Sequence, residues 1–173
     1  MRVALVAVLL LALAGCADRP DLRAKTVRYQ ADYPQYQTLE ELFKAADLVA
    51  EVRLGATAEV RGPTQTVPDV HTVFAATVER TYKGAAPARL EIKQGGGRYK
   101  GTDHIEAGSV SLQPGGHYVV FVEVYDDAPA SLLNPAQGQY RLDEAGTVTP
   151  VDATGLRFIL ADLDRLRPGI QPR

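Results

Sequence analysis

Cys16 is the residue whose chemistry the sequence defines most clearly. It is the only cysteine among 173 residues, so no disulfide can form within the chain. A catalytic thiol is disfavoured at this point, because Cys16 directly follows an apolar segment of the kind that is removed during export. A thiolate is a good nucleophile near neutral pH, so the chemistry that remains is covalent modification of the sulfur.

The residues before Cys16 have the form of a signal peptide. Arg2 gives a positive start, and Val3–Ala14 is an uninterrupted apolar run, shorter than the about 20 residues that span a bilayer as a helix. A buried core helix is the alternative, but Gly15 ends the run and no helical period continues after it. Leu13-Ala14-Gly15-Cys16 resembles the lipobox of bacterial lipoproteins. The resemblance implies that Cys16 becomes the first mature residue and carries a thioether-linked diacylglyceryl group.

A lipid on Cys16 implies a location. Burial of an acyl chain contributes about 0.8 kcal/mol per CH₂, so two or more chains hold a protein firmly to a bilayer. We therefore expect the protein to be lipid-anchored at the cell membrane, facing the extracytoplasmic side. The expected divisions are a signal peptide over residues 1–15, a tether over 16–37 that shows neither a helical nor a strand period, and a domain over 38–173.

Three histidines are the remaining candidates for acid–base or metal chemistry: His71, His104 and His117. A site would need them to converge in the fold, and their spacing neither requires nor forbids this. The nucleophile elbow, the zinc-protease motif and the phosphate-binding loop are absent from the sequence. The sequence therefore assigns no catalytic residue, no metal site and no cofactor. A metal- or histidine-dependent envelope enzyme remains an alternative function.

The segment Gln94–Gly101 is the one stretch that invites a ligand-binding hypothesis. Its consecutive glycines would let the backbone approach a ligand closely, and Arg98 and Lys100 flank the aromatic ring of Tyr99. This combination suits an anionic glycan or a phosphate, and His104 in the following segment joins the candidate set. The alternative is a flexible connection whose basic side chains are simply solvated.

The composition argues against one class of partner, nucleic acid. The formal net charge is −2, with 19 basic and 21 acidic residues, and this lacks the basic excess typical of nucleic-acid-binding proteins. Residues 38–173 are enough to bury a core without disulfide or metal staples. We therefore expect a monomer without a nucleic-acid partner. The expected partners are the membrane, through the lipid on Cys16, and an envelope protein or glycan ligand.

Periodic apolar residues indicate a mainly β domain that follows a short helix. Thr38 and Glu41 have the spacing of a capping box at the start of that helix. From 48 to 60 every even residue is apolar, which predicts a half-buried strand of roughly 43 Å that bends at Gly55. Further strands are expected over residues 70–82, 88–94 and 117–124, with a closing hairpin over 139–151 and a final helix over 156–166.

The strand order, the Tyr82-Lys83-Gly84 turn and the Pro114-Gly115-Gly116 start of the 117–124 strand resemble the netrin-like module. This module occurs in tissue inhibitors of metalloproteinases and in similar bacterial lipoproteins. The resemblance covers about residues 47–166 and implies a five-stranded OB-like barrel, with a β-sandwich as the alternative. In the inhibitors the mature N-terminal cysteine chelates the protease zinc. The matching residue would be Cys16, so protease inhibition is the second alternative function.

These features together predict a lipid-anchored, extracytoplasmic binding or interaction module of the cell envelope. Convergence of the three histidines in the fold would favour the enzyme. An exposed aromatic and basic patch on a barrel face would favour binding.

Overall fold

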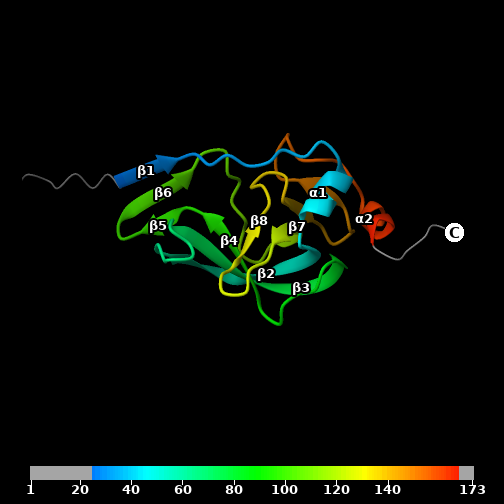
Figure 1. Cartoon of the computed structure of the whole chain (residues 1–173), viewed down its shortest axis with the longest axis horizontal. Helices are drawn as coiled ribbons and strands as arrows, with labels where there is room; N and C mark the ends of the chain where they lie inside the picture. Colours follow the sequence, from blue (N-terminus) through cyan, green and yellow to red (C-terminus); the bar gives the residue numbers. More distant parts are fainter. Residues whose placement is uncertain (1–24, 168–173) are drawn as a thin grey trace, which may run out of the picture.

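Two long antiparallel strands, β2 (Leu48–Arg61) and β3 (His71–Lys83), form the frame of the domain, as the apolar periods predicted. The structure, a computed structural model shown in Figure 1, describes residues 25–167, so Cys16 and the expected signal peptide lie outside it. The remaining strands are β1 (Lys25–Tyr29), β4 (Leu90–Gly95), β5 (Gly97–Tyr99), β6 (Thr102–Glu106), β7 (His117–Glu123), β8 (Ala130–Leu132), β9 (Gln139–Leu142) and β10 (Val148–Pro150). Two short helices are present, α1 (Leu39–Ala45) and α2 (Leu160–Leu166). Within the described range, no helix has the length and apolar character needed to span a bilayer.

Five of the strands close into a barrel. They follow the order β7-β2-β3-β4-β8, and β8 pairs back onto β7. All of these pairs are antiparallel except β4 with β8, which run parallel. The result is a closed, mixed five-stranded barrel of the OB-like kind with two short helices, so the expected barrel is confirmed over the sandwich alternative.

The strand that closes the barrel is short and interrupted. β8 covers the end of β7, where Leu132 pairs with Val122, and β9 covers the start of β7, where Gln139 pairs with Val120. Residues 134–137 loop out between β8 and β9, and a hydrogen bond of 2.7 Å from Gly138 N to the Asn134 carbonyl closes this loop. β9 then forms the expected hairpin with β10, and its turn lies at residues 143–146.

β2 bends at Gly55, as expected. Its register with β3 shifts just after Leu54, and the Gly55 carbonyl accepts a hydrogen bond of 2.8 Å from Gly115 N. Even-numbered residues are buried from 48 to 54, whereas Ala56 is exposed. The prediction that even positions stay inside as far as residue 60 was therefore wrong. The reason is that β7 pairs with β2 only as far as Arg53, so the second half of β2 leaves that ladder.

Apolar side chains pack on both faces of β7, as its continuous apolar sequence predicted. Even-numbered residues 118–122 join the core inside the barrel, and Val119 and Phe121 join a second core beneath the helices. The Phe121 ring meets the rings of Tyr140 and Phe158 edge to face, with ring centres 5.8 and 6.0 Å away. The second core therefore attaches both helices and the β9–β10 hairpin to the outside of the barrel.

The Tyr82-Lys83-Gly84 turn joins the barrel to α1. Lys83 Nζ donates hydrogen bonds to the backbone oxygens of Phe43, Lys44 and Ala46, at 2.9, 2.7 and 2.5 Å. A positive group is favourable at this end of a helix, where carbonyl oxygens lack partners. Gly84 has a φ of +78°, and a Cβ atom there would collide with the Asp47 carbonyl. The turn therefore fixes α1 in place, and glycine is needed at its last position.

Residues 25–37 lie along the domain, although the sequence predicted an extended tether without a strand here. β1 pairs in parallel with β6 over five residues, in a small sheet that also contains β5. The chain then runs across the molecule from β1 to α1 (Figure 1). There the Thr38 hydroxyl accepts a hydrogen bond of 3.2 Å from Glu41 N, as the capping-box spacing predicted. The sequence did not predict β1, because almost all of its side chains are exposed and the segment shows no apolar period.

The burial of β2 can be tested with two substitutions on the same strand. Val52 is fully buried in the barrel core, and Thr57 is exposed beyond the bend. Val52→Asp should lower the free energy of unfolding by several kcal/mol, because it places an unpaired carboxylate in an apolar core. Thr57→Asp should change it by less than about 0.5 kcal/mol. Denaturant unfolding measures both values, and equal losses would contradict the bend and the parity assigned to β2.

Candidate functional site

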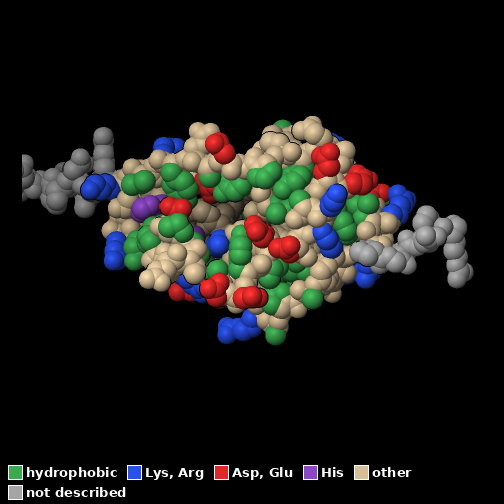
Figure 2. All heavy atoms as spheres, viewed as in Figure 1, with side chains coloured by type: hydrophobic (Ala, Val, Ile, Leu, Met, Phe, Trp, Pro, Cys, Tyr) green, Lys and Arg blue, Asp and Glu red, His purple; other side chains and the backbone are tan. Residues whose placement is uncertain are grey.

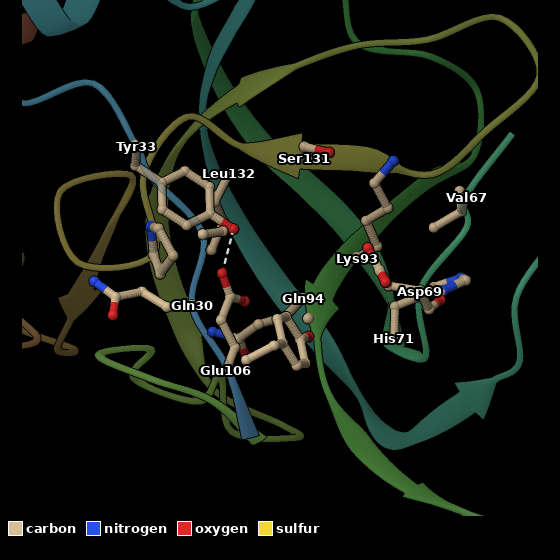
Figure 3. A pocket seen from close by; sticks show the side chains of 14 residues that line it. Gln30, Tyr33, Val67, Asp69, His71, Lys93, Gln94, Glu106, Ser131 and Leu132 are labelled. Atoms are coloured by element: carbon tan, nitrogen blue, oxygen red, sulfur yellow. Dashed lines mark hydrogen bonds between the residues drawn. The ribbon is translucent and has the colours of Figure 1, made fainter. Parts of the chain in front are cut away.

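A cavity of about 440 Å³ lies between the N-terminal segment and one side of the barrel. Residues 29–33 form one wall, and the loop before β3, the end of β4 and β8 form the other (Figure 3). Its ionisable lining groups are those of Tyr29, Tyr33, Asp69, His71, Lys93 and Glu106. The N-terminal segment therefore completes a polar site that the barrel alone would leave open.

Glu106, the last residue of β6, is the buried acid of this cavity. Its side chain belongs to a residue that is only 5 % exposed, and the Tyr33 hydroxyl donates a hydrogen bond to its Oε1 (Figure 3). Its other oxygen lies over Gly95, where a Cβ atom would collide with it. Between residues 25 and 167, no basic side chain forms an ion pair with Glu106. The Glu106 carboxyl group therefore has acceptor capacity that the described residues leave unused.

The Tyr29 hydroxyl is a second buried polar group at the same place. It lies near Glu106 Oε2 over Gly95, and the described part of the chain offers it no hydrogen-bond partner. Burial, with the negative charges of Glu106 and Asp69, raises the pKa of Tyr29 to about 12. Burial and the hydrogen bond to Glu106 raise the pKa of Tyr33 as well. Both phenols are therefore neutral at physiological pH, and each can donate and accept a hydrogen bond.

The two basic side chains of the cavity lie on the opposite side from the Tyr33–Glu106 hydrogen bond (Figure 3). Lys93 Nζ is 4.7 Å from the centre of the Tyr125 ring, and burial lowers the pKa of Lys93. His71 is 3 % exposed, and its Nδ1 lies 2.8 Å from the backbone oxygen of Asp69. The cavity therefore has one end with the Glu106 carboxyl and two phenols, and another end where the amine of Lys93 and the imidazole of His71 lie beside Asp69 (Figure 3).

Side-chain amides from the looped-out residues 134–137 hold the wall formed by the N-terminal segment. The Gln137 amide accepts from Tyr36 N at 2.9 Å and donates to Tyr36 O at 3.0 Å, as a neighbouring strand would. The Asn134 amide donates to Pro34 O at 2.9 Å. Both amides are buried, so these backbone contacts are shielded from water. Tyr36, which is partly buried against the second core, therefore packs on the body of the domain.

The ligand-binding residues that the sequence suggested lie beside this cavity. Arg98, Tyr99 and His104 belong to the β5–β6 hairpin, with Lys100 in its two-residue turn. Lys100 has a φ of +47° and the following glycine +79°, the arrangement of a tight type I′ turn, so the segment is a defined hairpin.

Only two of these four side chains share a concave surface. Arg98 and His104 line a neighbouring hollow of about 510 Å³. Lys100 Nζ lies 5.1 Å from the centre of the Tyr99 ring, and that ring packs against Gly62. The Tyr99 ring is therefore occupied within the protein, and the hairpin does not present it as an open platform.

The three histidines do not come together. His71 lines the cavity and His104 the neighbouring hollow, whereas His117 Nε2 lies 2.9 Å from the Glu79 carboxylate on the surface of the β2–β3 pair. Over residues 25–167, no group of three or more His, Cys, Asp and Glu side chains is placed to hold a metal ion. The convergence that would have favoured a histidine-dependent enzyme is therefore not observed in this region.

The sequence contained a partial signal for the cavity. Tyr29 and Tyr33 are four residues apart in a segment without periodicity, and Glu106 lies two residues after the candidate His104. Their convergence depends on the parallel pairing of β1 with β6, which brings Tyr29 opposite Glu106. Since no sequence pattern indicated that pairing, the site could not be predicted. In comparisons with protein-family models, curated proteins and solved structures, no match to the chain was found.

The buried phenol of Tyr29 predicts a pH dependence of stability. Its pKa in the folded protein is about 12, above the ordinary value of 10.0. Below pH 10 Tyr29 is neutral in both states, but between pH 10 and 12 it ionises only in the unfolded chain. The stability that it contributes is therefore complete below pH 10 and is lost as the pH rises through 12. The free energy of unfolding of Tyr29→Phe should fall less steeply over this range, as measured by urea unfolding at each pH. Parallel curves for the two proteins would contradict the burial of this hydroxyl.

Proposed function

We propose that the protein is a lipid-anchored binding module of the cell envelope, held at the extracytoplasmic side of the cell membrane through Cys16. The short apolar run and the lipobox-like residues Leu13–Cys16 support the anchor. The closed OB-like barrel supports a netrin-like relationship, which the Tyr82-Lys83-Gly84 turn and the Pro114-Gly115-Gly116 segment first suggested. In this proposal the protein acts as a monomer whose membrane contact is the lipid.

The observation that carries the binding role is the cavity between the N-terminal segment and the barrel. It combines a concave shape with a few convergent polar groups, which is the usual character of a ligand site. The Glu106 carboxyl and the Tyr29 hydroxyl retain hydrogen-bonding capacity that residues 25–167 do not use. A buried polar group without a partner is costly, so a ligand that satisfies both groups would bind favourably.

The ligand in this proposal is a small polar molecule or the polar end of an envelope protein or glycan, and it is not a nucleic acid. On the face shown in Figure 2, Lys and Arg side chains are interspersed with Asp and Glu. That face therefore lacks the continuous basic stripe that a nucleic acid would need.

The anchor is tested by mass spectrometry of the protein from the membrane fraction. We expect a mature N-terminus at Cys16 that carries a diacylglyceryl adduct. Cys16→Ser should leave an unprocessed precursor without lipid, because a hydroxyl is too weak a nucleophile to replace the thiolate. An intact Met1 N-terminus together with a free thiol in the wild-type protein would contradict the anchor.

The binding role is tested by filling the cavity. Ser131 of β8 lines it (Figure 3), so Ser131→Trp would place an indole ring inside. Thr57→Trp adds the same ring at an exposed position of β2 and serves as the matched control. Each protein is purified from membranes in detergent, and the small molecules released on denaturation are identified by mass spectrometry. Wild type and Thr57→Trp should retain a compound that Ser131→Trp lacks. Identical compounds in all three would contradict ligand binding at this cavity.

A further inference from the structure

We propose that the ligand presents a primary ammonium group, which binds at the acidic end of the cavity between Glu106, Tyr29 and Tyr33. This inference rests on the proposed binding function and specifies the chemistry of its ligand. The ammonium group is either that of a free alkylamine or that of a lysine side chain.

The charges around this end of the cavity favour a cation. Glu106 is buried and has no basic partner in the described chain. Asp69 lies at the other end of the cavity, beside Lys93 and His71 (Figure 3), but its negative charge reaches both Tyr29 and Tyr33. The lysine that lines the cavity, Lys93, lies on the side opposite Glu106 (Figure 3), and its Nζ is 4.7 Å from the centre of the Tyr125 ring. The Glu106 carboxyl group, with a smaller contribution from Asp69 at the other end, therefore acts on this end of the cavity without a paired cation among residues 25–167.

The hydrogen-bonding groups match the three N–H donors of an ammonium. Glu106 Oε2 and the Tyr29 hydroxyl both lie over Gly95, whose missing side chain leaves room for them. The Tyr33 hydroxyl gives its hydrogen to Glu106 Oε1, so its oxygen remains able to accept. One –NH₃⁺ group can donate to all three oxygens, and a hydrogen bond from a charged donor to a carboxylate is among the strong ones.

Other ligand chemistries fit this end less well. An anion would be repelled by Glu106, the carboxylate of this end. A divalent metal ion would require several carboxylate or histidine ligands together, and residues 25–167 provide no such group of three. A neutral hydroxyl would leave the buried carboxyl without a counter-charge.

The test is a titration of the full chain in detergent micelles, with ring ¹³C-labelled tyrosine observed by NMR. Butylammonium chloride is the free-amine probe, and N-acetyl-lysine methylamide represents a lysine side chain. The matched controls are 1-butanol and sodium butyrate at the same ionic strength. Tyr29→Phe and Tyr33→Phe assign the two reporter signals by removing one tyrosine each.

Butylammonium should shift the Tyr29 and Tyr33 signals in a saturable way, and the two controls should not. Tighter binding of the lysine derivative than of butylammonium would identify a lysine side chain as the source, and its failure to bind would identify a free amine. Glu106→Gln should weaken butylammonium binding by about tenfold or more, because it removes the negative charge with little change of shape. Glu40→Gln, which removes an exposed acid of α1, should leave the affinity unchanged.

Two results would overturn the ammonium assignment: equal shifts with butanol or butyrate, or an unchanged affinity in Glu106→Gln. If Glu106→Gln fails to fold, Tyr29→Phe provides the test. Loss of the butylammonium-induced shift of the Tyr33 signal in this variant would support the assignment. A full shift of that signal at unchanged affinity for butylammonium would oppose it. Retention of an envelope compound that Ser131→Trp lacks, together with no response to butylammonium, would leave the binding function standing and reject only this ligand class.

Discussion

The structure depends on the pairing of two separate segments, β8 and β9, with the same edge of β7. β8 pairs with the end of β7 and closes the barrel through β4, and β9 pairs with the start of β7. Since both segments lie on the same edge, the chain between them must loop out at residues 134–137. An uninterrupted strand along this edge would have left no loop to carry Asn134 and Gln137. The interruption therefore provides the two amides that bind the N-terminal segment.

The cavity follows from this attachment. The amides at 134 and 137 fix residues 34–36, and the pairing of β1 with β6 fixes residues 25–29. The chain between these two attachments must cross the side of the barrel, and it carries Tyr33 across with it. The Tyr33 hydroxyl of this wall reaches Glu106 because Glu106 is the last residue of β6, the strand with which β1 pairs. The polarity of the site is thus a result of strand pairing, since a buried carboxyl is tolerated only where donors are brought to it.

The long strands of the fold could be predicted from the sequence because their burial leaves a pattern. A strand with one buried face alternates apolar and polar residues, and a strand buried on both faces is continuously apolar. β2 as far as Leu54 and β7 show this in their apolar patterns, and Gly55 marked the bend. Thr38 and Glu41 marked the start of α1 through their own side-chain chemistry.

The exposure of the second half of β2, the strand β1 and the cavity could not be predicted, because they depend on partners far away in the chain. β1 has exposed side chains and is defined by backbone hydrogen bonds to β6. Cavity residues come from five separate segments, and nothing local distinguishes Glu106 from an ordinary surface acid. In the β5–β6 hairpin the sequence suggested a site that the structure does not present. The composition of residues 98–100 suggested a binding loop, but the Tyr99 ring packs within the protein.

The parallel pairing of β1 and β6 also determines how the domain responds to tension. β1 points away from the body at its N-terminal end (Figure 1), and its five pairs with β6 lie along that direction. A pull on the chain that precedes β1 would load all five pairs in shear, because none can separate before the others. Once they yield, the load passes to the amide contacts at Pro34 and Tyr36, and only then to α1 and the barrel. The wall of the cavity is therefore the first part of the domain to lie in the path of the force, and stretching would open the site while the barrel stays closed.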